Sequence, residues 1–412
     1  MAGMPCRIES TSVPPSEPGS PATSPLPECL AWIEGEIDAL RAAGLERGAR
    51  VREGRQGGEV CLDGRTLLNF GSNDYLGYAG DVRLTKAASK ASCAEGFGAG
   101  ASPLVSGHSA AHAALERAIA SLLAVEAALV FPSGFAANTA TIAALVGPAD
   151  FIASDERNHA SIIDGCRLSR ARIGIYRHRD LGSLEAVLSM AHEARRRLVV
   201  TDTLFSMDGT IAPLAALCDI ARRHDAMLFV DEAHATGVFG RRGGGLVEET
   251  NTADGVHVRV GTLSKALGAA GGFVAGNARL IHWLRHAARA WIFSTAHPPG
   301  VAAAATRAIG LVGEEPRRRT ELRGRAAEFA GRLRTAGLDI GAAEAQIVPI
   351  IAGAPSAAVA LAERLAAEGF FVPAIRPPSV PRGGSLVRAS LSWLHDDKDL
   401  DRLAAALATH GR

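Results

Sequence analysis

The chain has 412 residues, of which 47% are hydrophobic, and its formal net charge is +1. A charge this close to neutral gives no electrostatic basis for binding nucleic acid or an anionic membrane. The length is sufficient for one large domain and a smaller one, or for a single elaborate α/β unit. No apolar run reaches the ~20 residues that a membrane-spanning helix needs, and we expect no signal peptide at the N-terminus.

The cysteines and the N-terminal composition indicate a cytoplasmic protein with a tail. Disulfide frameworks are typical of short secreted chains, and zinc sites need closely spaced cysteines. Here six cysteines are scattered along the chain without a close pair, so we expect reduced thiols and no metal. Residues 1–27 are rich in Pro and Ser, which predicts a disordered tail.

The first predicted elements are a helix and a hairpin. Apolar residues at helical spacing predict a helix over 30–40. Two strands, over 60–62 and 66–70, flank the turn Asp63–Gly64, where glycine accepts the positive φ that a hairpin turn requires. We assign residues 28–75 to an N-terminal arm.

From residue 110 helices alternate with short apolar strands. The predicted elements are helices over 115–123, 136–145 and 214–224, and strands over 127–131, 198–201, 227–230 and 256–260. A β-α-β arrangement is typical of a mostly parallel sheet, so we expect an α/β fold with a large domain over 76–303. Such sheets bind ligands at the carboxyl ends of their strands, which makes the polar residues after these strands candidate site residues.

The pattern changes beyond residue 303. Helices are predicted over 319–336 and 357–369, with strands over 346–351 and 386–392. We therefore expect a smaller α+β domain over 304–412.

Lys265 is the most informative candidate residue. It lies in Gly261–Gly268, a segment of small residues that follows the predicted strand over 256–260. A lysine held there is rigid and partly desolvated, which lowers its pKa and frees the amine for Schiff-base chemistry. Taken alone, a lysine in a Gly/Ala loop is more often structural.

Two further segments support a site for pyridoxal phosphate (PLP). Asp231 directly follows a buried strand, where an unpaired charge is costly, and a protonated pyridine nitrogen would pair with it. His234 could hydrogen-bond a cofactor oxygen. Gly134 and Phe135 join a strand to a helix, so their N–H groups could bind phosphate. A salt bridge for Asp231 and a core role for His234 are the structural alternatives.

The order of these segments resembles the aspartate-aminotransferase-like fold of PLP enzymes, fold type I. Further motifs resemble the α-oxoamine synthases, which join an amino acid to an acyl thioester with loss of CO2. These motifs are Ser72–Gly77, Val105–Gly107, Asn158–Ser161, Phe205–Gly209, Asp231–Gly237 and Thr262–Gly268. Within the family, Ala374–Pro381 is very similar to the branch that makes 8-amino-7-oxononanoate for biotin synthesis.

The resemblance implies a role for each matched residue. The catalytic group would be Lys265 as the Schiff-base lysine, His159 stacked on the ring, Asp231 at the ring nitrogen and His234 at the phenolic oxygen. Cofactor contacts would also come from Ser206 at the phenolic oxygen and from Thr262, Gly134 and Phe135 at the phosphate. Substrate contacts would come from Arg388, which would hold the amino-acid carboxylate, and from Asn73, Ser379 and Arg47. The family also implies a homodimer, with L-alanine and pimeloyl-CoA or a pimeloyl carrier protein as substrates.

Some positions depart from the biotin branch and keep alternatives open. Pro103 stands where many relatives have arginine, Asp202 where the biotin branch often has glutamate, and 158–165 is also similar to glycine C-acetyltransferases (2-amino-3-ketobutyrate ligases). A sibling synthase with another amino acid or acyl group is therefore one alternative, and a generic aminotransferase a weaker one. An inactive partner subunit is the non-enzyme alternative. The joint presence of four residues argues against it: Lys265, Asp231, His159 and His234.

Overall fold

The computed structural model describes residues 26–411, so almost all of the predicted tail over 1–27 lies outside the described residues. The chain divides into two compact units, one ending at Gly48 and the other beginning at Ala49. In the first unit, a 3-10 helix (Glu28–Leu30) precedes helix α1 (Trp32–Ala42). Helix α1 confirms the predicted helix over 30–40, although it begins two residues later.

The second unit opens with a small sheet whose order is β1-β2-β3-β12. Its strands are β1 (Arg52–Glu53), β2 (Glu59–Leu62), β3 (Arg65–Asn69) and β12 (Phe370–Phe371). Asp63 and Gly64 have φ values of 53° and 72°, so both adopt the left-handed conformation that a tight two-residue hairpin needs. The predicted hairpin is confirmed.

A seven-stranded sheet forms the centre of this unit, with the order β4-β10-β9-β8-β7-β5-β6. Its strands are β4 (Ala127–Phe131), β5 (Phe151–Asp155), β6 (Arg172–Tyr176), β7 (Arg197–Asp202), β8 (Ala226–Asp231), β9 (Val258–Thr262) and β10 (Gly272–Gly276). Neighbouring strands are parallel except that β10 is antiparallel to both β4 and β9. The α/β fold with a mostly parallel sheet is confirmed.

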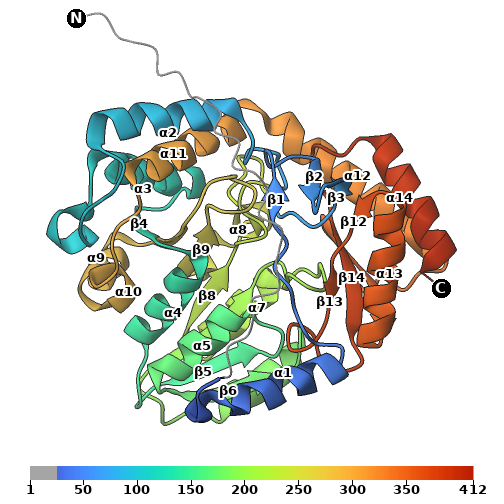
Figure 1. Cartoon of the computed structure of the whole chain (residues 1–412). Coiled ribbons are helices and arrows are strands. Elements are labelled where there is room, and N and C mark those ends of the chain that lie inside the picture. The colour runs from blue at the N-terminus through green and yellow to red at the C-terminus, as the bar shows by residue number, and fades with distance from the viewer. Residues whose placement is uncertain (1–25, 412) are drawn as a thin grey trace, which may run out of the picture. The chain divides into compact units, whose positions relative to one another are not determined.

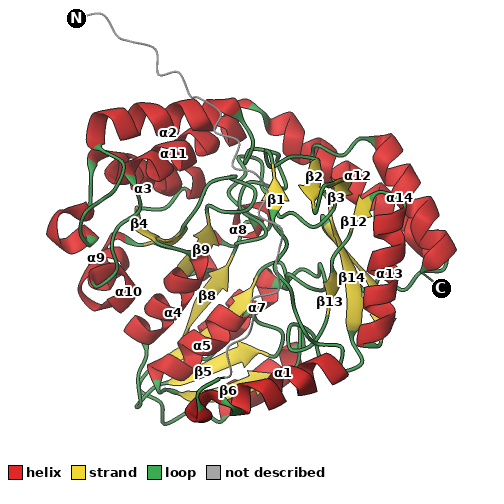
Figure 2. Ribbon diagram, in the orientation of Figure 1, coloured by secondary structure: helices red, strands yellow, loops and turns green. Residues whose placement is uncertain are grey.

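The central strands are buried on both faces. Along β8, Leu228 and Val230 belong to one apolar cluster, while Phe229 belongs to the other. Because side chains alternate along a strand, each face of the sheet packs against its own layer, as expected for parallel sheets. The helices of this region (Figure 2) are α2 (Val82–Glu95), α3 (Ala110–Leu123), α4 (Gly134–Leu145), α5 (Ala160–Ser169), α6 (Leu181–Ser189), α7 (Leu214–Arg223), α8 (Leu246–Glu249), α9 (Ala278–Ala287), α10 (Arg289–Ile292) and α11 (Pro299–Glu314).

One predicted strand is placed wrongly. The strand expected over 256–260 is β9, which spans Val258–Thr262. A 3-10 turn over Ala253–Gly255 delays its start, and the Val256 amide donates to the carbonyl of Ala253 rather than to the sheet. Thr262 is therefore the last strand residue, three positions before Lys265.

The C-terminal part forms a third sheet, which is antiparallel and has the order β11-β14-β13. Its strands are β11 (Ile347–Gly353), β13 (Ala374–Ile375) and β14 (Ser385–Ser390), and its helices, orange to red in Figure 1, are α12 (Pro316–Thr335), α13 (Pro355–Ala367) and α14 (Asp397–His410). A smaller α+β region is thus present as predicted. The proposed domain boundary at residues 303 and 304 falls within α11 and stays a proposal. Within residues 26–411, no helix is long and apolar enough to cross a membrane.

Candidate active site

Three polar residues end three neighbouring strands of the large sheet. Asp202, Asp231 and Thr262 are the last residues of β7, β8 and β9. The parallel register pairs Asp202 with Asp231, so the two carboxylates lie side by side at the carboxyl edge of the sheet. This edge is where a parallel sheet binds its ligands.

Lys265 lies in a tight turn directly after β9. The turn closes with a hydrogen bond of 2.9 Å from the Gly268 amide to the Lys265 carbonyl, and Gly268 has a φ of 60°. A Cβ at Gly268 would lie 2.4 Å from the amide nitrogen of Ala79, so the turn packs directly on another backbone segment. The lysine side chain is therefore held by a rigid turn.

The amine of Lys265 is perturbed toward its neutral form. Its Nζ lies 2.7 Å from Nε2 of His234. The residue as a whole is half-buried, but protein atoms surround the amine, and this burial lowers the pKa of Lys265 to about 8 against the opposing effect of Asp231 and Asp202. A substantial neutral fraction near physiological pH is what a nucleophilic lysine requires.

His234 connects Lys265 to a tyrosine that the sequence did not indicate. His234 is 4% exposed, and its Nδ1 lies 2.6 Å from the hydroxyl of Tyr75. Burial, and then the charge of Lys265, lower the pKa of His234 well below its ordinary value. The imidazole is therefore neutral. Tyr75 lies within the Ser72–Gly77 motif, which was the only signal for it.

Asp231 is buried and bound by two donors. Asn138 Nδ2 donates to it at 2.6 Å and the Ala233 amide at 2.8 Å. Burial, reinforced by Asp231, raises the pKa of neighbouring Asp202 well above its ordinary value. Asn138 was not predicted, although it follows Gly134 by one helical turn and so shares its face of α4.

His159 lies at the N-terminus of α5, beside these carboxylates. Its amide donates to Asp202 Oδ2 at 2.8 Å, and its Nδ1 accepts from the Ser161 amide at 3.2 Å. Ser161 Oγ in turn accepts from Asn138 Nδ2 at 2.8 Å. His159 is exposed and therefore accessible to a ligand.

The N-terminus of α4 lies next to the end of β9. Ser133 accepts from the amides of Ala136 and Ala137, whereas within residues 26–411 the amides of Gly134 and Phe135 have no hydrogen-bond partner. A Cβ at Gly134 would meet Thr262 Cβ at 3.4 Å. The glycine therefore lets the helix end lie against the end of β9, and the two amides together with the helix dipole favour a phosphate.

Arg388 on β14 is a buried cation without an acidic partner among the described residues. It is 7% exposed. Its Nη1 donates to the Ser206 carbonyl at 3.0 Å, its Nη2 to Asn73 Oδ1 at 2.5 Å and Ser390 Oγ at 3.0 Å, and its Nε has no partner in the described structure. A buried guanidinium in this state favours an incoming carboxylate.

The other two predicted substrate residues are Ser379 and Arg47. Ser379 is exposed in the loop between β13 and β14, where its amide donates to the Arg376 carbonyl at 3.1 Å. Arg47 lies in the first unit and is also exposed. Their roles, like those of the other site residues, stay predictions.

The assembled groups fit PLP. The perturbed Lys265 amine suits the aldehyde, the α4 N-terminus with Thr262 suits the phosphate, and the buried Asp231 suits the ring nitrogen. The exposed His159 and the neutral imidazole of His234 suit the ring plane and the phenolic oxygen. No described group in the cluster conflicts with the cofactor.

Comparison with known proteins agrees with this chemistry. The profile of the family described as aminotransferase class I and II matches residues 65–407. The chain is 50% identical to the 8-amino-7-oxononanoate synthase of Anaeromyxobacter sp. (strain Fw109-5), covering 92% of this chain and 95% of the relative. It is 47% identical to the enzyme of that name from Geobacter sulfurreducens, covering 92% and 98%.

Solved structures of similar proteins include two serine palmitoyltransferases. The enzyme from Sphingomonas wittichii is 32% identical with a TM-score of 0.88, covering 94% of this chain and 98% of that one. A variant from S. paucimobilis with a bound PLP–myriocin aldimine is 30% identical with a TM-score of 0.88, covering 93% and 98%. An 8-amino-7-oxononanoate synthase from Francisella tularensis is 25% identical with a TM-score of 0.72, covering 83% and 97%.

Proposed function

Because the chain belongs to the class I and II aminotransferases, and within them to the PLP-dependent α-oxoamine synthases, we propose that it makes 8-amino-7-oxononanoate for biotin synthesis. The reaction joins L-alanine to a pimeloyl thioester and releases CO2 and the free thiol. CoA or a carrier protein would supply the pimeloyl group. The location we propose, from the cysteine pattern, is the cytoplasm.

A path of polar contacts between the reactive amine and the buried cation carries this proposal. Lys265 contacts His234, His234 contacts Tyr75, the Tyr75 hydroxyl lies 3.2 Å from Asn73 Oδ1, and Asn73 accepts from Arg388. One side of the site thus offers a neutral amine and the other an unpaired guanidinium. An α-amino acid, with its Cα next to its carboxylate, suits this pair of groups.

The residues of the chain would divide the chemistry among them. PLP bound at this site supplies an electron-accepting ring that stabilises negative charge at the amino-acid Cα. Arg388 would bind the alanine carboxylate and thereby orient Cα. Lys265, with a pKa near 8, would accept the Cα proton as a general base and return a proton to the product. Asp231, held by Asn138, would keep the ring nitrogen protonated.

The choice of alanine and a pimeloyl group rests on the curated relatives. Relatives named 8-amino-7-oxononanoate synthase reach 44–50% identity over 92% of this chain, against 30–32% for the serine palmitoyltransferase structures. Condensation of serine with a long-chain acyl thioester is the second candidate, because those structures superpose with TM-scores up to 0.88.

A second copy of the chain is part of the proposal. Large apolar side chains are exposed on two neighbouring segments, Phe97, Leu104 and Val105 on one and Phe293 on the other. The segments are joined by a hydrogen bond of 3.0 Å from the Ala296 amide to the Ala101 carbonyl. Exposed apolar residues that gather in this way mark interaction surfaces, and most soluble homo-oligomers are symmetric dimers. We expect a dimer in sedimentation velocity, and a fully active monomer at assay concentration would contradict it.

The direct test is a substrate panel with the PLP-loaded protein. L-Alanine, glycine and L-serine would each be combined with pimeloyl-, acetyl- and palmitoyl-CoA, and CO2 and free thiol would be measured together. We expect the highest kcat/KM with alanine and pimeloyl-CoA, with CO2 and thiol released in equal amounts. Some glycine turnover is compatible, because one methyl group discriminates by only ~1–3 kcal/mol. A higher kcat/KM for glycine with acetyl-CoA, or for serine with palmitoyl-CoA, would overturn the assignment.

A further inference from the structure

We propose that Tyr75 is a positioning residue that fixes which ring nitrogen of His234 carries the proton, and thereby keeps the amine of Lys265 ready to react. Tyr75 itself would touch neither cofactor nor substrate in this role. It would act through the imidazole that separates it from the lysine. The inference rests on the reactive role proposed above for Lys265.

The hydrogen bonds of the Tyr75 hydroxyl determine where its single proton goes. Two acceptors lie within reach, His234 Nδ1 at 2.6 Å and Asn73 Oδ1 at 3.2 Å. Asn73 Oδ1 already accepts from Arg388 Nη2 at 2.5 Å. The shorter contact and the less occupied acceptor both favour donation to Nδ1.

Donation to Nδ1 dictates the tautomer of a neutral imidazole. With its Nδ1 lone pair engaged, His234 carries its proton on Nε2. That N–H lies 2.7 Å from Lys265 Nζ, and it can donate only to a nitrogen with a free lone pair. A neutral amine has this lone pair and an ammonium does not, so the arrangement selects the neutral amine.

The surrounding charges make this selection necessary. Asp231 and Asp202 face Lys265 and favour its charged form, while Arg388 opposes it. His234 in turn faces Lys265, Arg388 and His159, which all disfavour a charged imidazole. A neutral amine next to two carboxyl groups therefore needs a hydrogen-bond donor as well as burial, and His234 is the donor in contact with it.

The backbone around Tyr75 holds the hydroxyl in place. The tyrosine side chain is fully buried, and its carbonyl accepts from the Trp393 amide at 2.8 Å. On the residue before it, the carboxylate of Asp74 accepts from the amides of Tyr78 and Ala79 at 2.9 and 3.0 Å. These bonds fix the turn that carries Tyr75 into the site.

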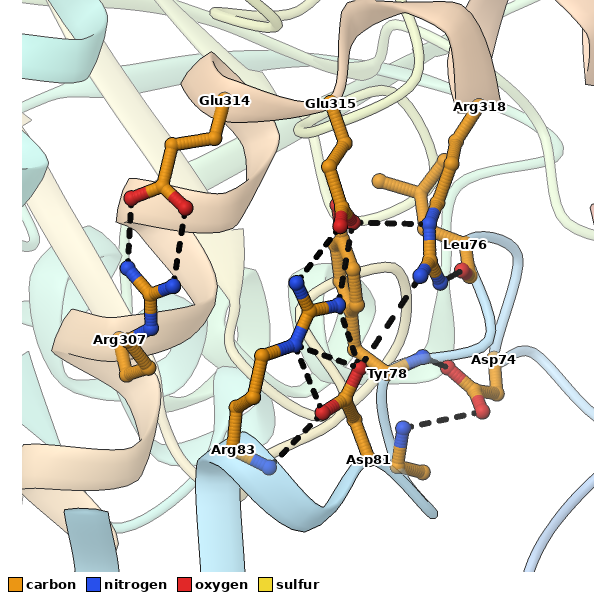
Figure 3. Close-up of polar contacts among 10 residues, drawn as sticks. Asp74, Leu76, Tyr78, Asp81, Arg83, Arg307, Glu314, Glu315 and Arg318 are labelled. Atoms are coloured by element: carbon orange, nitrogen blue, oxygen red, sulfur yellow. Dashed lines mark hydrogen bonds and ion pairs between the residues drawn. The ribbon is translucent and has the colours of Figure 1, made fainter. Parts of the chain in front are cut away.

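An ionic cluster behind the turn, drawn in Figure 3, holds it from the other side. Arg318 Nη1 donates to the Leu76 carbonyl at 2.7 Å, and its guanidinium lies 4.6 Å from the ring centre of Tyr78. Glu315 pairs with Arg318 at 2.9 Å and with Arg83 at 2.6 Å, and accepts from the Tyr78 hydroxyl at 3.2 Å. The cluster thus joins α2 and α12 to the Tyr75 turn.

Tyr75 and Lys265 also share this support. The Lys265 turn packs through Gly268 on the backbone of Tyr78 and Ala79, the two residues that Asp74 caps. The distance between the tyrosine hydroxyl and the lysine amine is therefore set by one rigid assembly, with His234 between them.

The test compares Tyr75→Phe with Tyr176→Phe in the full-length protein. Tyr176 is a matched control, because it is 1% exposed at the end of β6 and loses the same single oxygen. The readout is the rate at which visible absorbance develops when PLP is added to apoprotein, followed from pH 6.5 to 10. This rate depends on the neutral fraction of Lys265, so it reports the protonation of the amine without turnover.

The expected result is a displaced pH profile in one variant only. We expect a wild-type midpoint near pH 8, and a midpoint about one pH unit higher in Tyr75→Phe, which is a rate about tenfold lower at pH 7. At pH 10 the rates should converge, and Tyr176→Phe should match the wild type. An unchanged midpoint in a folded Tyr75→Phe protein would overturn the proposal.

A double-mutant cycle separates positioning from a merely structural effect. In a His234→Gln background there is no imidazole tautomer to fix, so adding Tyr75→Phe should no longer move the midpoint. Equal displacement in both backgrounds would contradict the proposal. Nitrogen-15 spectra of labelled apoprotein give a second reading: a protonated Nε2 is expected for wild-type His234, and a protonated Nδ1 would refute the tautomer.

The same experiments distinguish the two levels of inference. A wild type that develops no visible absorbance with PLP would overturn the role of Lys265. Normal absorbance with an unchanged profile in Tyr75→Phe would overturn the role of Tyr75 alone.

Discussion

Replacing Arg388 by lysine tests how the site holds an amino acid. A guanidinium has five N–H groups, and three are used by Ser206, Asn73 and Ser390. Nε–H has no partner among the described residues, so it is available to a carboxylate. Lysine keeps the positive charge but cannot offer the planar pair of donors.

The expected cost follows from the lost hydrogen bond. A hydrogen bond to a charged group contributes about 1.5–3 kcal/mol, which corresponds to about 10- to 150-fold in Kd. We expect Arg388→Lys to weaken L-alanine binding by about this factor, measured by absorbance titration of the PLP-loaded protein, while PLP affinity stays unchanged. Arg319→Lys is the control, because Arg319 is also 7% exposed and donates to backbone carbonyls. Unchanged alanine affinity in Arg388→Lys would mean that the carboxylate is held elsewhere.

Three further predictions address the cofactor end and the supporting turn. A Cβ at Gly272 would lie 2.5 Å from the Gly134 amide nitrogen, so Gly272→Ala should lower PLP affinity and cost about 1–3 kcal/mol of stability. PLP titration and urea unfolding measure the two effects. Gly147→Ala is the control and should change neither, because a Cβ at Gly147 would have no atom within 4 Å. Burial raises the pKa of Asp74 to about 6, so the stability that Asp74 contributes is present below its unfolded pKa near 3.8 and is lost as the pH rises through 6. The free energy of unfolding should therefore fall by about 3 kcal/mol over this pH range. Asp74→Asn should remove most of this fall, as measured by unfolding across the same range. Lys265→Ala should fold but show none of the visible absorbance of PLP-loaded wild type after unlinked PLP is removed, and retained absorbance would point to another lysine.

Strands β7 and β8 and their ends were predictable because burial leaves a direct mark on sequence, whereas the internal strand β5 was not predicted. The runs over 198–200 and 227–230 are continuously apolar, as is typical of strands covered on both faces, and an aspartate follows each run within two residues. The strand β6 was not predicted, since as an edge strand it mixes exposed and buried residues. The antiparallel β10 was also missed, because its short connection from β9 gives no helical signal.

The contacts within the site were less predictable than its residues. Tyr75 and His234 are 159 positions apart, and their hydrogen bond exists only because two turns pack together. The same holds for Asn138 and Asp231, which are 93 positions apart. Local sequence patterns carry information on helices, strands and turns, whereas a contact of this kind depends on the packing of whole elements.

The two halves of the site come from different parts of the fold, and this bears on how substrates are chosen. Asp231 and Thr262 end adjacent strands of the large sheet and Lys265 lies in the turn after β9, so one rigid ladder of hydrogen bonds sets their mutual positions. Arg388 belongs to the three-stranded sheet β11-β14-β13, where substitutions leave that ladder intact. Relatives that are named for different activities can therefore share the lysine chemistry while differing in the substrates that β14 and its neighbours bind.

The segment between these halves makes them interdependent. Asn73 contacts Arg388, and Tyr75, two residues further, contacts His234. A shift of this short turn would move the carboxylate-binding group and the proton donor of the lysine together. Binding of an amino-acid carboxylate at Arg388 would compete with Asn73 for guanidinium donors, and an Asn73 oxygen released in this way becomes a better acceptor for the Tyr75 hydroxyl. The hydroxyl would then no longer donate to Nδ1, so occupation of the carboxylate site would favour the tautomer of His234 that carries its proton on Nδ1. In this tautomer Nε2 can accept a hydrogen bond from a protonated amine. Lys265 has this protonated form after it has taken the Cα proton.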